Sequence, residues 1–369
     1  MRVAFRTDAS IQIGTGHVMR CLTLANELTS QGHQCWFVCR EHPGNLSDLI
    51  ARQGHSLTLL PAPAIESPQE KDTVPDDYAL WLGVPWQEDA RQTLDVISPL
   101  KPDWLIVDHY ALDAQWECIL ASAVGDIMAI DDLANRPHAC SLLLDQNLGR
   151  AASDYDGLLP EECQRLIGPA FALLRPEFAA IREQSLERRK DPVLKRILIS
   201  LGGIDRTNVT GQVLEALATL PLPASTELDI IMGAAAPHLE EVRQQAAQLP
   251  FKATVNVNVT DMAERMCQAD LSIGAAGGTS WERCSLGLPA VLVVLAKNQV
   301  AGADALETAG AAMKIGDAVS IETRLSPILK DLSNARRLKQ MCKAAAIITD
   351  GHGAYSVART ISIAGRQEW

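Results

Sequence analysis

The first residues that could do chemistry lie in a short glycine-containing stretch, IGTGHVMR, at residues 13–20. Gly14 and Gly16 let the backbone approach a ligand closely and adopt positive φ angles. His17 opens the helix expected to follow, where the positive end of the helix dipole and the charge of Arg20 both disfavour an imidazolium. A neutral His17 can accept a proton near pH 7, so we interpret it as a general base, with a capping or packing histidine as the alternative.

The same glycines begin the dinucleotide-binding pattern G-x-G-x-x-G, but the pattern is broken. Met19 occupies the place of the third glycine, and the turn that precedes Gly14 is too long for a Rossmann fingerprint. Glu41 could stand in for the acid that binds the ribose of NAD. Because the glycine pattern fails, we expect no NAD and no other cofactor.

A second glycine pair lies in SLGGID, residues 200–205, directly after an expected strand. Gly202 and Gly203 form a turn that can come close to a ligand. A tight connection from strand to helix explains the same residues equally well, so both readings stay open.

A third loop, GAAGGTSWERCSLGLP at residues 274–289, runs from a strand into a helix. Backbone N–H groups at such a point can hold a pyrophosphate. Thr279 and Glu282 also fit a T-x-x-E capping box, which is the structural alternative. After the next strand, Asn298 and Gln299 offer amides to sugar hydroxyls or phosphate oxygens. The candidate pyrophosphate ligands in this loop are Gly277, Gly278, Thr279 and Ser280.

Carboxylates gather after two strands of the first half, at residues 107–117 and 131–138. They could orient a polar sugar or cap the helices that follow. Asp154 and Asp156 match D-x-D, but they lie in a loop that no strand precedes. We therefore expect no metal site.

The elements that would position these loops are short apolar runs alternating with longer amphipathic segments, twice along the 369 residues. This alternation predicts an α/β protein of two doubly wound Rossmann-like domains that face a central cleft, with ligands at the carboxyl ends of the strands. We expect an N-terminal domain at 1–190, with the junction at the end of the charged stretch 182–191. A nucleotide-binding domain at 191–350 would follow, and then a helix at 351–369 that could pack back on the first domain.

Charge and composition exclude several classes of protein. Lysine and arginine number 33 against 45 acidic residues, and 33 − 45 gives a net charge of −12, which argues against a nucleic-acid groove. The apolar runs are too short to span a bilayer, and the first residues carry charge where a signal peptide would be apolar. The nine cysteines are odd in number and have no C-x-x-C pair, so we expect reduced thiols in a cytoplasmic protein.

Several motifs, in order, resemble the PseG family, the UDP-sugar hydrolases of pseudaminic acid biosynthesis. Its opening is FRTDASIQIGTGHVMRCLTLA, and further matches are WLGVPWQEDA, VDHYALDAQWE, AIDDLANRPH, LLLDQN, GPAFALLRPEF, SLGGIDRTNVT, AAGGTSWERCSLGLPAVLVVLAKNQ and DGHGA. That family is similar to the MurG transferases and has the GT-B type of fold. Phe171 departs from the pattern, because relatives often carry tyrosine there, and only a hydroxyl contact is put in doubt.

The resemblance implies inverting, metal-independent hydrolysis of UDP-2,4-diacetamido-2,4,6-trideoxy-β-L-altropyranose at its anomeric carbon, which gives UDP and the free sugar. It implies that His17 activates the water, with Tyr78 as an active-site partner. Glu282 would bind the ribose, and Asn298 and Gln299 would reach the phosphate or the sugar. The other residues expected to contact the substrate are Gly14, Gly16, Arg20, Gly202, Gly203, Gly277, Gly278, Thr279 and Ser280.

Two other functions fit the same loops. A GT-B glycosyltransferase would use the UDP site with an acceptor in place of water, and a non-catalytic module would bind the UDP-sugar without turnover. No apolar or basic segment near the first-half loops suggests a membrane-bound acceptor. We expect a monomer that binds a UDP-sugar, with neither a nucleic acid nor a membrane as partner.

Overall fold

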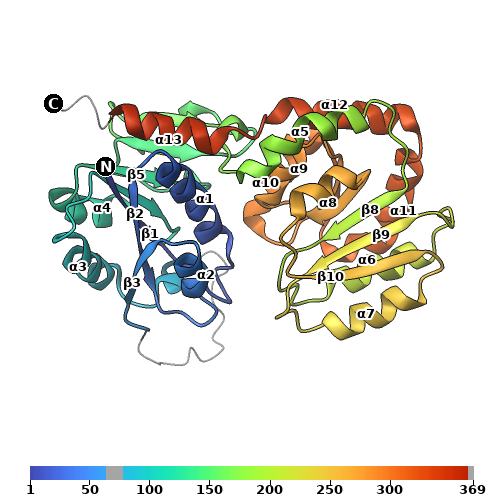
Figure 1. The fold of residues 1–369 in the computed structure, drawn as a ribbon, viewed down its shortest axis with the longest axis horizontal. Helices are drawn as coiled ribbons and strands as arrows, with labels where there is room; N and C mark the ends of the chain where they lie inside the picture. Colours follow the sequence, from blue (N-terminus) through green and yellow to red (C-terminus); the bar gives the residue numbers. More distant parts are fainter. Residues whose placement is uncertain (64–77, 365–369) are drawn as a thin grey trace. The chain divides into compact units, whose positions relative to one another are not determined.

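The computed structural model describes residues 1–63 and 78–364, and the chain divides into two compact units (Figure 1). The first unit comprises Met1–Leu173 together with Gly353–Trp369, and the second comprises Leu174–His352. Each unit is built on its own parallel β-sheet.

The first unit has a seven-stranded parallel sheet in the order β3-β2-β1-β4-β5-β6-β7. Its strands are β1 (Arg2–Thr7), β2 (Gln34–Arg40), β3 (Ser56–Leu60), β4 (Trp104–Asp108), β5 (Asp126–Ile130), β6 (Leu142–Asp145) and β7 (Gln164–Ile167). Its helices are α1 (Gly16–Ser30), α2 (Ser47–Arg52), α3 (Trp86–Ile97), α4 (Ala114–Leu120) and α13 (Gly353–Ala364). Short 3-10 turns are η1 (Tyr78–Leu82), η2 (Ala121–Ala123), η3 (Ala152–Tyr155) and η4 (Pro169–Phe171).

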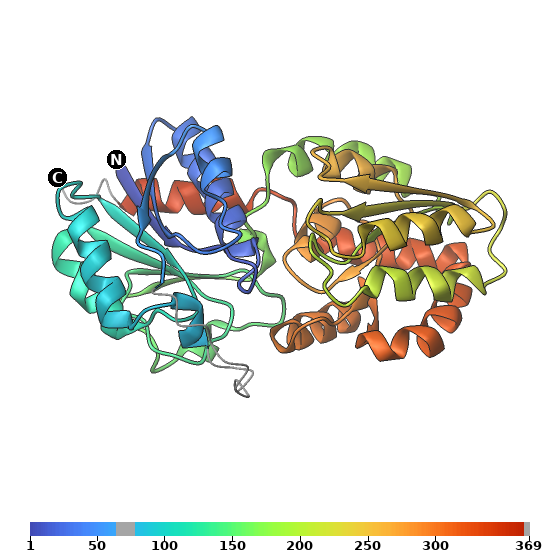
Figure 2. The same ribbon diagram turned by 90° about the horizontal axis from the view of Figure 1, so that it is seen from below.

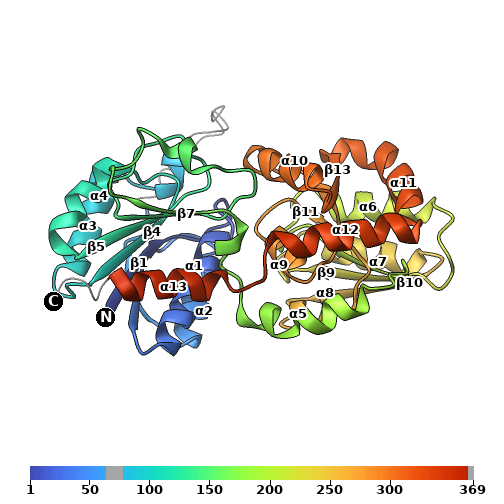
Figure 3. The ribbon, with the colours of Figure 1, turned by 90° about the horizontal axis from the view of Figure 1, so that it is seen from above.

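Helices cover both faces of this sheet. Since successive side chains of a strand point to opposite sides, neighbouring residues of one strand enter different cores. Phe5 of β1 lies in the core that α1 and α13 complete. Its neighbour Ala4 lies in the other core, with Trp116 of α4. The last helix, α13, runs alongside α1 (Figure 3) and buries Val357 and Ile361 there. The C-terminal helix is thus part of the first unit.

The second unit has a six-stranded parallel sheet in the order β10-β9-β8-β11-β12-β13. Its strands are β8 (Arg196–Ser200), β9 (Glu227–Met232), β10 (Lys252–Val257), β11 (Leu271–Ala275), β12 (Ala290–Val293) and β13 (Ala312–Gly316). Its helices are α5 (Pro176–Arg188), α6 (Val209–Ala218), α7 (Leu239–Gln248), α8 (Met262–Gln268), α9 (Thr279–Ser285), α10 (Val300–Thr308), α11 (Ile321–Leu332) and α12 (Ala335–Ile348), with short turns η5 (Lys297–Gln299) and η6 (Ala318–Ser320). Helices again lie on both faces of the sheet (Figure 2).

The boundary between the units lies one helix earlier than the junction expected at 190/191. Helix α5 packs on α8 and α9, and its Phe178 is buried in a core of the second unit with Leu198. Arg189 donates hydrogen bonds to the backbone oxygens of Met266 (2.7 Å) and Ala269 (2.9 Å) at the end of α8. The charged stretch is therefore not a linker, because its arginines satisfy helix-end carbonyls of the second unit.

In both sheets the order of strands reverses beside the first strand, which is where open α/β sheets bind ligands. The reversal falls between β1 and β4 in the first unit, and between β8 and β11 in the second. The first loop with chemistry follows β1, and the two later glycine loops follow β8 and β11. Topology thus places all three predicted loops at reversal points.

Within residues 1–63 and 78–364, none of the helices has both the length and the apolar character needed to cross a bilayer. The nine cysteines are free thiols.

Candidate active site

His17 is the second residue of α1, and its side chain is only 9% exposed. Its Nδ1 atom lies 2.6 Å from Oδ1 of Asp108, the last residue of β4. An ionised carboxylate can only accept, so Nδ1 carries the proton and donates it to Asp108. The other ring nitrogen, Nε2, is then left with a lone pair. Because Nε2 can accept a proton, His17 can serve as a general base.

Asp108 is fully buried and remains ionised. Burial alone would raise the pKa of its carboxyl group, but the charge of Arg20 and the hydrogen bonds from Arg20 and His17 outweigh burial and hold that pKa well below its usual range. Arg20 binds both carboxylate oxygens, with Nε 2.6 Å from Oδ2 and Nη2 2.7 Å from Oδ1. Its Nη1 reaches Asp132 at 2.7 Å. Arg20 therefore holds the carboxylate of Asp108 in place, and Asp108 in turn orients the ring of His17.

An aromatic cluster packs around the His17 ring. The Tyr110 ring meets it edge-on at 4.7 Å between centroids, and Trp81 lies at 6.2 Å. Tyr78, predicted as an active-site partner, contacts these two rings, at 5.0 Å from Tyr110 and 4.8 Å from Trp81. The structure thus brings Tyr78 into the same cluster, one ring away from His17.

Of the first glycine pair, only Gly14 has a positive φ angle, at 80°. Its N–H donates to the backbone oxygen of Ser10 (2.9 Å), which closes the turn after β1. Gly16 is the first residue of α1 and does not use the positive φ that a glycine allows, because an α-helix needs negative φ. No heavy atom lies within 4 Å of the position a Cβ would take at either glycine. Both remain accessible to a ligand's close approach.

The second loop, after β8, is a tight turn into α6. Gly202 has a φ of 101°, and the backbone oxygen of Gly203 accepts the N–H of Gly233 at 2.9 Å. The carboxylate of Asp205 accepts the N–H groups of Val209 and Thr210, both at 2.8 Å. Asp205 therefore serves the helix start, while the two glycines leave the space beside them open.

The third loop does not form the capping box that was the structural alternative for Thr279 and Glu282. Thr279 is the first residue of α9 and Gly278 is the N-cap, so Thr279 stands one position too late. Glu282 instead pairs with Arg175, whose Nη2 lies 3.4 Å from Oε1. Burial raises the pKa of Glu282, and the charge of Arg175 opposes that shift. The hydrogen bonds of Gly277 and Gly278 oxygens to Ser280 (2.9 Å) and Trp281 (3.0 Å) close the turn.

The two amides predicted after β12 lie in η5 and differ in their surroundings. Gln299 accepts the N–H of Leu295 through Oε1 at 3.0 Å. Its Nε2 lies 3.7 Å from the position of a Cβ on Gly277, so this amide stands beside the third loop. Asn298 is exposed at the same turn. The structure therefore brings Gln299, but not Asn298, against a predicted pyrophosphate ligand.

The described residues contain no group of three or more His, Cys, Asp or Glu side chains arranged to hold a metal ion. The two acids of the D-x-D sequence have local partners. Asp154 accepts the N–H of Ala151 at 3.0 Å, and Asp156 pairs with Arg165 at 2.7 Å.

Sequence reasoning missed Asp108 and Asp132 as parts of the His17 cluster. Their position at strand ends was visible, but it fitted sugar binding and helix capping equally well. Asp113, from the same stretch as Asp108, does cap α4 by accepting the N–H of Gln115 at 2.9 Å. A carboxylate after a strand can therefore either orient His17 or cap a helix, and the sequence alone does not distinguish these two roles.

Comparisons with known proteins agree with this architecture. Residues 199–360 match the glycosyltransferase family 28 C-terminal domain. The chain is 27% identical over 300 residues to the UDP-2,4-diacetamido-2,4,6-trideoxy-beta-L-altropyranose hydrolase of Campylobacter jejuni, covering 81% of this chain and 93% of that protein. It is 32% identical over 340 residues to the UDP-N-acetylglucosamine–N-acetylmuramyl-(pentapeptide) pyrophosphoryl-undecaprenol N-acetylglucosamine transferase of Acidithiobacillus ferrooxidans, covering 86% of each.

Among solved structures, MurG of Acinetobacter baumannii superposes with a TM-score of 0.70 at 18% identity, covering 98% of this chain and 99% of that one. This match confirms the predicted α/β architecture with two Rossmann-like sheets, which is of the GT-B type. The relatives also confirm the resemblance to the PseG hydrolases. The chain belongs to the MurG-like family of GT-B proteins, with a glycosyltransferase family 28 C-terminal domain.

Proposed function

We propose that the protein is a nucleotide-sugar hydrolase that splits UDP-2,4-diacetamido-2,4,6-trideoxy-β-L-altropyranose into UDP and the free sugar, a step of pseudaminic acid biosynthesis. The observation that carries the proposal is the His17–Asp108 pair, at 2.6 Å, with Nε2 left as a proton acceptor. The 27% identity to the Campylobacter jejuni hydrolase, over 93% of that protein, supports the choice of substrate.

In this reaction the oxygen of a water molecule bonds to the anomeric carbon while His17 Nε2 takes one of its protons. The bond between that carbon and the diphosphate oxygen breaks, and its electron pair leaves with UDP. Attack from the face opposite the leaving group inverts the anomeric centre. Asp108 stabilises the imidazolium that forms and keeps the ring in the accepting tautomer. UDP is a good leaving group, so the scheme needs no metal ion.

We assign the binding of UDP to the second unit. The third loop would hold the pyrophosphate through Gly277, Gly278, Thr279 and Ser280, and Glu282 would bind the ribose. Gln299 and Asn298 would reach a phosphate or the sugar, and Gly202 and Gly203 would let the turn after β8 come close to the ligand. The open space beside both glycines of that turn supports this role.

Transfer of the sugar to an acceptor is the second candidate function, and the family 28 domain and the transferase relatives favour it. The two reactions share the donor site and differ in the nucleophile. Hydrolysis proceeds in water alone, whereas transfer stalls until an acceptor is added.

Incubation of the purified protein with the UDP-sugar in ¹⁸O-water tests the proposal. We expect steady release of UDP without any acceptor, one ¹⁸O atom in the sugar, and none in UDP. Label in the phosphate would mean attack at phosphorus. Release of UDP only after an acceptor is added would identify a transferase.

A further inference from the structure

A buried arginine lies directly beneath the third loop. Arg283 of α9 is 1% exposed, and its Nη2 donates to the backbone oxygen of Ala275 (2.6 Å) and to Oγ of Ser280 (3.0 Å). A Cβ on Gly274 would stand 2.2 Å from Nη1 and 2.8 Å from the backbone oxygen of Ser200. The guanidinium therefore occupies the space between the carboxyl ends of β11 and β8, where only a glycine leaves it room.

Arg283 makes no direct ion pair with a carboxylate among the described residues, and the charge of its neighbour Glu282 only partly opposes the effect of burial on the Arg283 pKa. In the part of the chain that the structure describes, its Nε and Nη1 atoms have no hydrogen-bond partner, and its side chain makes no ion pair within 4.0 Å. Burial lowers the pKa of Arg283 to about 10, so the group is still charged at neutral pH. A buried cation without a counter-ion is costly, and an anion bound nearby would offset that cost.

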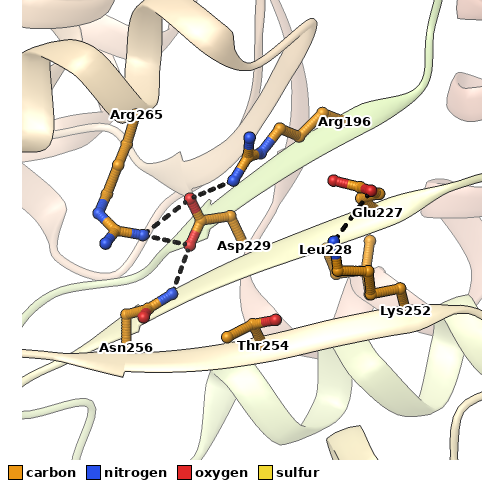
Figure 4. Close-up of a pocket in the computed structure, with 8 residues that line it drawn as sticks. All are labelled: Arg196, Glu227, Leu228, Asp229, Lys252, Thr254, Asn256 and Arg265. Carbon is orange, nitrogen blue, oxygen red and sulfur yellow. Dashed lines mark hydrogen bonds and ion pairs between the residues drawn. The ribbon is translucent and has the colours of Figure 1, made fainter.

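The opposite end of the same sheet holds two arginines that are paired with a carboxylate. Figure 4 shows a pocket of about 200 Å³ at the amino ends of β8, β9 and β10. There Asp229 binds Arg265 at 2.9 Å and Arg196 at 3.5 Å, and Asn256 donates to the same carboxylate at 2.8 Å (Figure 4). Asp229 thus pairs with both of those cations. Arg189, which is buried like Arg283, uses both of its Nη atoms as donors to backbone oxygens. Nη1 of Arg283, in contrast, has no partner among the described residues.

We propose that Arg283 is a positioning residue for the diphosphate of the nucleotide. Its charge lies under the loop that would hold the phosphates, and its Nη2 fixes the loop through Ala275 and Ser280. Because Ser280 Oγ accepts from Arg283, the hydroxyl proton of Ser280 is left to donate to another acceptor, such as a phosphate oxygen. Helix α9 has only seven residues, so its dipole adds little positive charge at the third loop. The guanidinium of Arg283 is the formal positive charge within this loop. This inference rests on the proposed UDP site.

The test compares the affinities of UDP and uridine by calorimetry, because only UDP carries the diphosphate. The variants are Arg283→Met and Arg283→Gln, which remove the charge, and Arg283→Lys, which keeps it. Gln retains one donor for Ala275 or Ser280, so it covers the case in which the Met variant fails to fold. Arg265→Met is the matched control, since it removes one positive charge from the same unit at the opposite edge of the sheet.

We expect the preference for UDP over uridine to fall by about tenfold or more in the Met and Gln variants, and by less in the Lys variant. Uridine affinity should change by less than about twofold, and Arg265→Met should keep the wild-type preference. A folded Gln variant with an unchanged preference overturns the inference, as does an equal loss in Arg265→Met. Failure of the wild-type protein to bind UDP would instead refute the proposed UDP site.

Discussion

Replacement of Asp108 by asparagine probes the acid that orients His17. The change keeps the size of the side chain but removes its negative charge and turns one oxygen into an amide. An asparagine NH₂ group can donate to Nδ1, which would hold the proton on Nε2, the wrong nitrogen. We therefore expect Asp108→Asn to keep the fold and the affinity for UDP while losing most of its turnover.

The structure sets the size of that loss. A separation of 2.6 Å between Nδ1 and Oδ1 puts the two charge centres about 4 Å apart, which is worth about 4 kcal/mol at an effective dielectric constant of 20. Nη2 of Arg20, 3.4 Å from Nδ1, repels the imidazolium and offsets part of that energy. The charge-assisted hydrogen bond adds about 1.5–3 kcal/mol. The net is about 3–5 kcal/mol, or roughly 10²–10⁴-fold in kcat.

The assay is UDP release from the UDP-sugar under saturating and limiting substrate, so that kcat and KM are separated. Asp132→Asn is the matched control, because it takes a carboxylate from Arg20 without touching His17. Its kcat should fall by less than about tenfold. A wild-type kcat in Asp108→Asn would refute the reasoning, and so would equal losses in both variants.

Two more predictions concern binding and pH. Glu282→Gln should abolish the preference for UDP over 2′-deoxy-UDP, whereas a purely structural Glu282 would weaken both nucleotides equally in calorimetry. Burial lowers the pKa of His109 to about 3, so the folded chain keeps it neutral while the unfolded chain takes up a proton below about pH 6.5. Stability should therefore fall as the pH drops below about 6.5, with a slope that approaches about 1.4 kcal/mol per unit from this residue. His109→Asn should remove that share, about 2 kcal/mol between pH 6.5 and 4.5. Urea unfolding followed by the fluorescence of the buried Trp104 and Trp116 measures it, and equal acid sensitivity in both proteins would contradict the assignment.

The interior of both sheets could be predicted from the sequence because buried parallel strands are continuous apolar runs. The strand Arg2–Thr7 is an example, because its apolar run at residues 3–5 is buried throughout. The strands Gln164–Ile167 and Ala312–Gly316 carry a weaker signal in the sequence. Each has few apolar residues in a row, because Gln164 and Arg165 begin the first and Lys314 interrupts the second.

The site residues also differ in how well the sequence predicts them. His17 and the glycine loops carry local signals, because each is a short motif between a strand and a helix. Asp108 stands 91 residues from His17, and the two meet only because β1 and β4 are neighbours in the sheet. Arg283 carries no signal in the sequence, because only the fold places it beneath the third loop. Residues that meet only through the strand order of a sheet leave no short motif in the sequence.

The proposed hydrolysis depends above all on His17 Nε2 as the group that takes the proton from water. The variant His17→Ala measures this directly, with His55→Ala, at the opposite end of the first unit's strands, as the control. We predict that kcat falls by roughly 10²–10⁴-fold in His17→Ala while the affinity for UDP stays within about threefold of the wild type. An unchanged kcat in a folded His17→Ala protein would contradict the account.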